Sequence, residues 1–321
     1  MTGTIEEKRA LLQELREESE LGGGQKRIDR QHEQGKYTAR ERIERLVDPG
    51  SFIEFDRFVV HRCSSFGMDQ KKKFLGDGVV TGIAEINHQK VALFSQDFTC
   101  WGGALGAAHA RKICKIMDFA LENRIPIIGI NDSGGARIQE GVESLGGYAE
   151  IFYRNVKASG VIPQLSLVMG PCAGGAVYSP AMTDFIFMVE KTSYMFVTGP
   201  DVIKTVTHEE VTKEELGGAN THNEKSGVAQ FRCVDEDECF ERVRELLSYI
   251  PASNFRKQEL KYTSDSVHRD NDKLKDFIPA NSRKPYDMKE VIFDIVDDQQ
   301  FMEVHKDYAK NIVVGFGSIG G

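Results

Sequence analysis

The sequence has 321 residues, of which 40% are hydrophobic and 28% are charged, enough for a folded core in one large or two medium domains. Its net charge of −8, from 41 basic and 49 acidic residues mixed along the chain, disfavours general nucleic-acid binding. Six scattered cysteines without a C-x-x-C pair argue against a metal site and for a reducing compartment, such as bacterial cytoplasm or mitochondrial matrix, and no run is apolar enough to span a membrane.

The chain begins with polar helices. Residues 5–21 predict a first helix, which the Gly22-Gly23-Gly24 run ends, and residues 25–34 predict a second. Thr38 with Glu41 three residues later has the pattern of a capping box for a third helix.

The next segment predicts a hairpin, followed by alternating helices and strands. The hairpin consists of two apolar runs, 79–86 and 91–98, joined by the four residues between them. The later elements are helices over 104–123, 141–159 and 236–249 and strands over 126–131, 163–169 and 185–189. Short parallel strands joined by helices indicate an α/β fold.

The segment after residue 285 repeats an earlier one. Ile43-x-x-Leu46-Val47-Asp48-x-x-x-Phe52-x-Glu54 matches Ile292-x-x-Ile295-Val296-Asp297-x-x-x-Phe301-x-Glu303 at a constant offset. A weaker match relates Val80-x-Gly82-x-x-x-Ile86 to Val313-x-Gly315-x-x-x-Ile319. We interpret the match as the start of a second copy of the domain, the alternative being a chance likeness of two amphipathic helices.

Three glycine-rich turns each follow an expected strand and precede an expected helix. They are Trp101-Gly102-Gly103-Ala104, Asn131 to Arg137, and Gly170 to Ala176. Glycine allows positive φ and close approach to a ligand, and unpaired amides at a helix N-terminus suit a phosphate or a developing oxyanion. The alternative is that these glycines only allow close packing of strand and helix. Neither a phosphate-loop pattern nor a G-x-S-x-G elbow is present in the sequence.

The side chains near these turns are weaker candidates. We expect His109 to be a helix residue and Cys172 to be a packed thiol, because the sequence shows no histidine partner for that cysteine. Asp132 and Glu140 could form a carboxylate pair, but loop capping is favoured. Arg137 is a candidate for binding an anion such as a phosphate. The lack of a side-chain base indicates a reaction whose base arrives on a cofactor.

Three stretches resemble the β-subunits of propionyl-CoA carboxylase, in the family of biotin-dependent acyl-CoA carboxyltransferases. They are Phe94 to Thr99, Asn131 to Gly141 and Met169 to Pro180, and the runs Gly22 to Asp29 and Phe196 to Val202 agree with them. The resemblance implies a ClpP/crotonase-type α/β fold of ββα units, with two such domains in each chain. It also implies hexamers, in which each active site lies between the N-domain of one subunit and the C-domain of another.

The resemblance implies the reaction as well. Carboxybiotin, delivered by a biotin carboxylase and biotin carboxyl carrier partner, releases CO₂, and the biotin enolate takes the α-proton of propionyl-CoA. The acyl-CoA enolate then attacks CO₂ to give methylmalonyl-CoA. By position, Gly174 and Gly175 match the oxyanion hole of the N-domain. Its CoA-side wall is matched by Gly102, Gly103, Ser133, Gly134, Gly135, Ala136, Arg137 and Ala173.

Members of this family are longer than the present sequence. We therefore expect N-terminal helices over residues 1–36, a carboxyltransferase domain over 37–250, a linker over 251–285 and the truncated start of a C-terminal domain over 286–321. The 321 residues by themselves are expected not to complete turnover. Two alternatives are a methylmalonyl-CoA decarboxylase α-subunit, which runs the transfer in reverse, and an inactive, truncated CoA-binding paralogue.

Overall fold

A computed structural model describes residues 3–258, 260, 262–266, 268–269, 271–281 and 283–321. Its strands are β1 (Ile53–Phe55), β2 (Val79–Ile86), β3 (Gln89–Gln96), β4 (Ile127–Ser133), β5 (Gln164–Ala173), β6 (Phe185–Val189), β7 (Tyr194–Phe196), β8 (Phe231–Cys233), β9 (Met302–Val304) and β10 (Val314–Phe316). Its helices are α1 (Ile5–Glu20), α2 (Gln25–Glu33), α3 (Ala39–Leu46), α4 (Ala107–Asn123), α5 (Val142–Ala158), α6 (Tyr178–Ala181), α7 (Pro200–Thr207), α8 (Lys213–Gly217), α9 (Glu236–Leu247) and α10 (Met288–Ile295).

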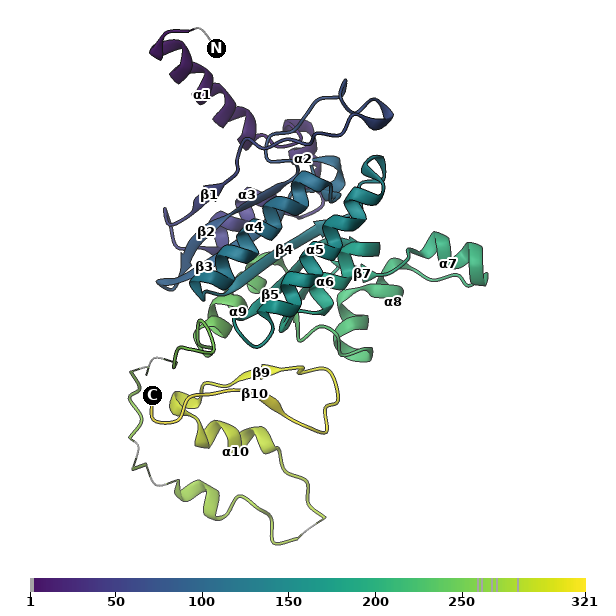
Figure 1. The fold of residues 1–321 in the computed structure, drawn as a ribbon. Coiled ribbons are helices and arrows are strands. Elements are labelled where there is room, and N and C mark those ends of the chain that lie inside the picture. Colours follow the sequence, from purple (N-terminus) through teal and green to yellow (C-terminus); the bar gives the residue numbers. More distant parts are fainter. Residues whose placement is uncertain (1–2, 259, 261, 267, 270, 282) are drawn as a thin grey trace.

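One eight-stranded sheet organises the main part of the chain (Figure 1). Its order is β1-β2-β3-β4-β5-β6-β8, with β7 beside the end of β5. The first three strands pair antiparallel, and the strands from β3 onward pair parallel. The crossovers between parallel strands include α4 and α5, which pack side by side on one face of the sheet. This is the strand-pair-and-helix unit that the sequence predicts.

Each face of the sheet has its own apolar core. On one face, α3, α9 and strand β9 pack against residues of the central strands such as Leu93, Leu167 and Phe187. On the other face, α4 and α5 pack through residues such as Ile113 and Ile151. Both faces of the parallel strands are therefore covered, which explains why these strands are continuous apolar runs.

Several elements differ from their predicted bounds. The hairpin turn has two residues, Asn87 and His88, both with positive φ, so β3 begins at Gln89 and not at Val91. The short elements β7, β8, α7 and α8 were not predicted, because segments of three to eight residues carry little periodic signal. The expected linker contains the short helical turn Asp272–Lys275, and its residues 259, 261, 267, 270 and 282 lie outside the described residues.

The C-terminal segment has the elements that the sequence repeat predicts. α10 and β9 lie at the same offset from α3 and β1, and β9 pairs antiparallel with β10. Glu303 is opposite Gly315, as Glu54 is opposite Gly82. A Cβ atom on Gly315 would meet the ring of Phe301, and one on Gly82 would meet the ring of Phe52. The repeat therefore extends from the sequence pattern to the pairing register and the packing of the aromatic ring.

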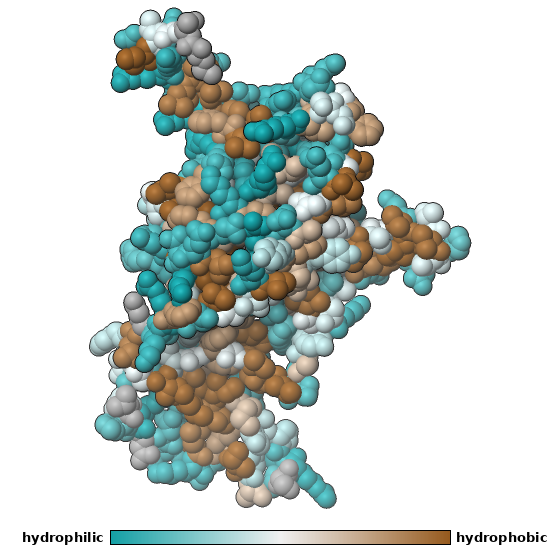
Figure 2. Space-filling model, viewed as in Figure 1, coloured by the Kyte–Doolittle hydropathy of each residue, from teal (hydrophilic) through white to brown (hydrophobic). Residues whose placement is uncertain are grey.

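Apolar side chains also gather on the surface of the segment around α7, which projects from the main body (Figures 1 and 2). Val197, Val202 and Val206 are exposed there. Among the described residues, no helix has the length and apolar character needed to cross a bilayer.

Candidate functional site

The three glycine-rich turns meet at one edge of the sheet. They lie at the carboxyl ends of β3, β4 and β5, which are adjacent parallel strands, so these ends point the same way. Binding sites of open parallel sheets form at that edge. Whether the three turns lie together depends on the strand order, which no single segment of the sequence reveals. In this sheet the strand order brings them together.

The first turn is unusual in its backbone. Trp101, Gly102 and Gly103 have consecutive positive φ values of 56°, 63° and 64°. This conformation is costly for tryptophan, and the indole is held by edge-on contacts with His61 and Phe74, at ring-centroid distances of 6.1 and 5.4 Å. A Cβ atom on Gly103 would overlap the carbonyl oxygen of Asp132, so only glycine allows this approach to the second turn.

Hydrogen bonds join the first turn to the second. The Ser133 hydroxyl donates to the carbonyl oxygen of Gly103 at 2.7 Å and accepts from the amide of Gly135 at 3.1 Å. The amide of Gly134 donates to the carbonyl oxygen of Gly102 at 2.9 Å. Ala136 forms a β-bridge with Leu105 in the chain that leads from the first turn. Ser133 and Gly135 are buried and Gly134 is exposed, so this loop presents mainly its backbone.

The third turn lies against the second. Ser133 is in register with Cys172, and a Cβ atom on Gly135 would lie 2.9 Å from the carbonyl oxygen of Ala173. Gly174 and Gly175 are the first residues of a short 3-10 helix, Gly174–Val177, where amides have no partner within the helix. Both glycines are half-exposed, so a ligand at this edge can reach their backbone.

The ring of Tyr148 in α5 packs against Gly175 of this turn. A Cβ atom on Gly175 would lie 2.8 and 2.9 Å from the Cδ2 and Cε2 atoms of the Tyr148 ring, closer than carbon atoms tolerate. The ring is buried and stacks on Phe152 at 6.0 Å. Tyr148 was not identified from the sequence, because nothing in its own segment indicates that it packs under a turn that starts about 25 residues later.

Cys172 and His109, which could act as a nucleophile and a base, are both buried. Cys172 is fully buried, its thiol donates to the carbonyl oxygen of Ala176 at 3.0 Å, and burial raises its pKa strongly. His109 is fully buried, its Nδ1 atom lies 3.1 Å from the carbonyl oxygen of Asp77, and burial lowers its pKa well below the ordinary value. The predictions of a packed thiol and a helix histidine agree with this geometry.

Arg137 is also buried. Its Nη1 atom donates to Asp77 and to Glu140, both at 2.8 Å, and its Nη2 atom donates to the carbonyl oxygen of Ala104 at 3.1 Å. The second carboxylate oxygen of Glu140 accepts from the amide of Ala107 at the start of α4, which is the capping role expected for Glu140. A contact between the Arg137 guanidinium and a phosphate is not supported by this geometry, because its side chain is 2% exposed.

Asp132 belongs to a second buried cluster. Its Oδ2 atom lies 2.7 Å from Lys36 Nζ and 2.9 Å from Arg42 Nη1. Arg42 also pairs with Glu236 at the start of α9 and donates to the carbonyl oxygen of Met169 at 3.0 Å. Burial opposes the charge on Arg42, but Glu236 and Asp132 overcome it and leave the pKa raised. Asp132 therefore pairs with Arg42 of α3 and with Lys36, which precedes this helix, and not with Glu140.

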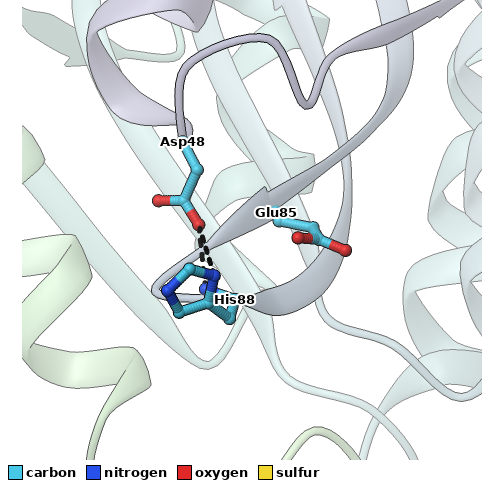
Figure 3. Close-up of side chains that lie close together, drawn as sticks. All are labelled: Asp48, Glu85 and His88. Carbon is cyan, nitrogen blue, oxygen red and sulfur yellow. Dashed lines mark hydrogen bonds and ion pairs between the residues drawn. The ribbon is translucent and has the colours of Figure 1, made fainter.

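A separate group lies at the other end of the β2–β3 hairpin. Asp48, Glu85 and His88 have potential metal-ligand atoms within 4.8 Å of one another (Figure 3). The two carboxylate oxygens of Asp48 already accept the amides of Asn87 and His88, at 3.1 and 2.8 Å. The imidazole of His88 is 95% exposed. We interpret this group as the cap of the hairpin turn.

The carboxyl transferase domain family matches residues 30–321. The propionyl-CoA carboxylase beta chain of Cereibacter sphaeroides is 59% identical over 309 residues, which cover 95% of this chain and 60% of that protein. The methylmalonyl-CoA decarboxylase subunit alpha of Veillonella parvula is 53% identical over 318 residues, which cover 99% of this chain and 62% of that protein. The chain thus spans about three fifths of the length of these curated relatives.

A solved structure gives the same result for the fold. The crystal structure of transcarboxylase 12S, with methylmalonyl-coenzyme A and methylmalonic acid bound, matches with a TM-score of 0.97 and 45% identity. The match covers 100% of this chain and 62% of that chain. The expected α/β carboxyltransferase fold of crotonase type is confirmed by this likeness.

Proposed function

Because the chain belongs to the carboxyl transferase domain family, we propose that it forms the acyl-CoA half of a carboxyltransferase site. The proposed overall reaction transfers a carboxyl group to the α-carbon of propionyl-CoA and gives methylmalonyl-CoA. Biotin carried by a partner subunit would supply the carboxyl group and accept the α-proton. The support is the set of close relatives and the meeting of the three turns at one sheet edge.

The observation that carries the proposal is the third turn. A thioester that loses its α-proton develops negative charge on its carbonyl oxygen, and preorganised backbone amides stabilise such a charge in the transition state. Gly174 and Gly175 offer amides at the start of a helix, half-exposed, on a turn held from below by Tyr148. We propose these two amides as the oxyanion hole.

The neighbouring side chains fit chemistry whose base comes from outside the chain. Each of four side chains makes at least one internal hydrogen bond or ion pair: Cys172, His109, Asp132 and Glu140. The groups that a ligand can reach at the turns include the peptide backbone of Gly134, Gly174 and Gly175. A reaction whose base is brought by a cofactor needs only backbone amide donors from the protein.

The proposed CoA-side wall consists of the first two turns. Of its residues, Gly102, Gly134, Ala136 and Ala173 are at least partly exposed. Gly103, Ser133, Gly135 and Arg137 are buried and join the turns to one another. Arg137 would act here as a positioning residue that ties the loop to Asp77, not as a phosphate ligand. Backbone recognition allows close approach of an extended pantetheine chain between neighbouring turns.

The proposed partners follow from the same relatives. We propose a biotin carboxylase and biotin carboxyl carrier subunit as partner and a homo-hexamer as assembly, since the transcarboxylase 12S structure is described as a hexamer assembly. All six cysteines are free, which agrees with a reducing compartment of bacterial cytoplasm or mitochondrial matrix. Because this chain covers about three fifths of its relatives, we expect the 321 residues alone to bind acyl-CoA without completing turnover.

Calorimetric titration of the chain tests the proposal. The ligands are CoA and a CoA thioether that ends in a nitroalkane, whose nitronate anion has the shape and charge of a thioester enolate. An oxyanion hole predicts a clear preference for the nitronate, because transition-state analogues bind more tightly than ground-state ligands. Equal affinity for the two ligands, or binding of neither, would contradict the proposed site.

A second candidate function has one specific observation in its favour. The 53% identity to a methylmalonyl-CoA decarboxylase subunit alpha suggests the same site working in the direction of decarboxylation. Affinity purification from the source cell separates the two functions. Recovery of a biotin carboxylase supports the carboxylase, whereas recovery of a membrane subunit supports the decarboxylase.

A further inference from the structure

A buried cluster of four charges lies directly behind the proposed site. Its members are between 0% and 4% exposed and come from three parts of the chain: Lys36 with Arg42, Asp132, and Glu236. The cluster contains two cations and two carboxylates, so its formal charge is zero. The ion-pair distances of 2.7 to 2.9 Å leave no room for bulk water between the groups.

This cluster is in contact with both strands that lead into the site. Asp132 immediately precedes Ser133 of the second turn, and a Cβ atom on Gly170 would overlap its carboxylate. Arg42 donates to the carbonyl oxygen of Met169 in the strand that ends at the third turn. The charge of Asp132 also contributes to the raised pKa of Cys172, second to burial, so its field extends into that turn.

The pairing within the cluster is uneven. Asp132 Oδ1 is buried and accepts no hydrogen bond from the described residues, whereas its Oδ2 atom contacts both cations. Among the described residues, Lys36 Nζ pairs with Asp132 and lies over the ring face of Phe98, 4.9 Å from the ring centroid. Burial lowers the pKa of Lys36, and Arg42 adds to this shift although Asp132 opposes it. Of the two cations, Lys36 is therefore the one whose charge its surroundings stabilise less, since the pKa of Arg42 is raised.

A purely structural role is the simplest account of such a cluster, since it joins α3, α9, β4 and β5. Replacement of any one member would then weaken the fold, and ligand binding would suffer in the same direction for every member. An electrostatic role predicts a different result. The effect of each substitution on the affinity for an anion would then depend on the sign of the charge that is removed.

We propose that Lys36 keeps the ion cluster neutral so that Asp132 does not oppose the negative charge that develops on the acyl-CoA oxygen at Gly174 and Gly175. This inference rests on the proposed function of those two amides. A buried charge in a low-dielectric interior acts over several ångströms without much screening. An unneutralised Asp132 would reduce the affinity of the turn for an anion while leaving the affinity for a neutral group in place. Lys36 is a positioning residue in this proposal and does not touch the ligand.

The test uses the same 321-residue chain and the same two ligands. The measured quantity is the ratio of the dissociation constant of CoA to that of the nitronate thioether. K36M leaves the cluster with one net negative charge and is expected to lower this ratio about tenfold, the effect of one poorly screened charge at a distance of several ångströms. D132N and E236Q each leave one net positive charge and are expected to hold or raise the ratio.

The double variant K36M/D132N gives the decisive comparison. It restores a neutral cluster, so the ratio is expected to return to the parent value although two native side chains are missing. K115M is the matched control, because Lys115 is an exposed cation whose removal changes the net charge equally but is screened by solvent. Melting temperature and the affinity for CoA itself show whether each variant is folded.

The outcomes separate the two proposals. If the parent chain does not prefer the nitronate, the oxyanion hole itself is wrong. If the parent prefers it and K36M keeps the full ratio, the neutralisation by Lys36 is wrong. The inference is also overturned if K36M, D132N and E236Q all lower the ratio, or if the double variant is worse than K36M, because those results belong to a structural role.

Discussion

Gly175→Ala is the substitution for which the structure gives the clearest expectation. The new Cβ atom would lie 2.8 Å from Cδ2 and 2.9 Å from Cε2 of Tyr148. An ordinary carbon–carbon contact of about 3.5 Å requires a movement of about 0.7 Å. Tyr148 is 4% exposed and stacks on Phe152, so the half-exposed turn is the part that moves.

The magnitude follows from what the turn does. A displacement above about 0.5 Å takes an amide donor out of productive geometry, and loss of one oxyanion donor costs about 10² to 10³ in rate. We expect a loss of similar size in nitronate affinity and little change for CoA. Overpacking should cost about 1–3 kcal/mol in the free energy of unfolding.

Gly160→Ala is the matched control for this experiment. Gly160 has a φ of 70° and lies in the connection between α5 and β5, where a Cβ atom would have no other atom within 4 Å. Alanine there should cost about 1–2 kcal/mol through backbone strain alone. Calorimetry and urea unfolding of both variants give the comparison. If G175A loses stability like the control but keeps the parent's preference for the nitronate, the amides of this turn do not form the oxyanion hole.

Three further predictions concern the fold around the site. Arg137→Met leaves two buried carboxylates unpaired and should lower the free energy of unfolding by about 3–5 kcal/mol in urea titration; a near-neutral effect would contradict a structural ion pair. Burial lowers the pKa of His109, so below about pH 6.5 the unfolded chain binds a proton that the folded chain excludes, and the free energy of unfolding decreases by about 1.4 kcal/mol for each unit by which the pH is lowered. H109Q should reduce this slope, whereas H88Q at an exposed position should not; an unchanged H109Q slope would refute the assignment. Gly82→Ala and Gly315→Ala should each destabilise their strand pair, because the new Cβ atom would meet a backbone carbonyl oxygen and a phenylalanine ring of the paired segment, as hydrogen exchange of the strand amides would show, and normal protection in both would refute the shared packing.

Local sequence signals were sufficient where the interaction itself is local. The capping box of Thr38 is present, with the Glu41 amide 3.3 Å from the threonine hydroxyl and the Glu41 carboxylate 2.8 Å from the Thr38 amide. The three glycine turns were found because each interrupts a strand-to-helix pattern within a few residues. Their joint position followed only when the strands between them proved to be parallel neighbours.

Contacts between distant segments could not be read in the same way. Arg137 follows two glycines in a turn, a pattern that suggests an exposed anion ligand, but its partner Asp77 lies 60 residues earlier and draws the guanidinium inward. Arg42 pairs with Asp132 and Glu236, which are 90 and 194 residues away. Periodicity and turn chemistry describe one segment at a time, so neither indicates which buried charge another segment will neutralise.

The internal repeat indicates whether Asp48 is a metal ligand or holds the backbone of a turn. Asp48 accepts the amides of Asn87 and His88, and Asp297 accepts those of Gly320 and Gly321, at 3.0 and 2.8 Å. The backbone amides of the two aspartates also donate to matching positions, the carbonyl oxygens of Glu85 and Ser318. In the second copy, serine and glycine stand at the positions of Glu85 and His88, so the repeat shares the aspartate but not the other two possible ligand side chains. What both copies keep is a carboxylate bound to two amides of residues with positive φ, so the shared role of the aspartate is to hold the backbone of this turn.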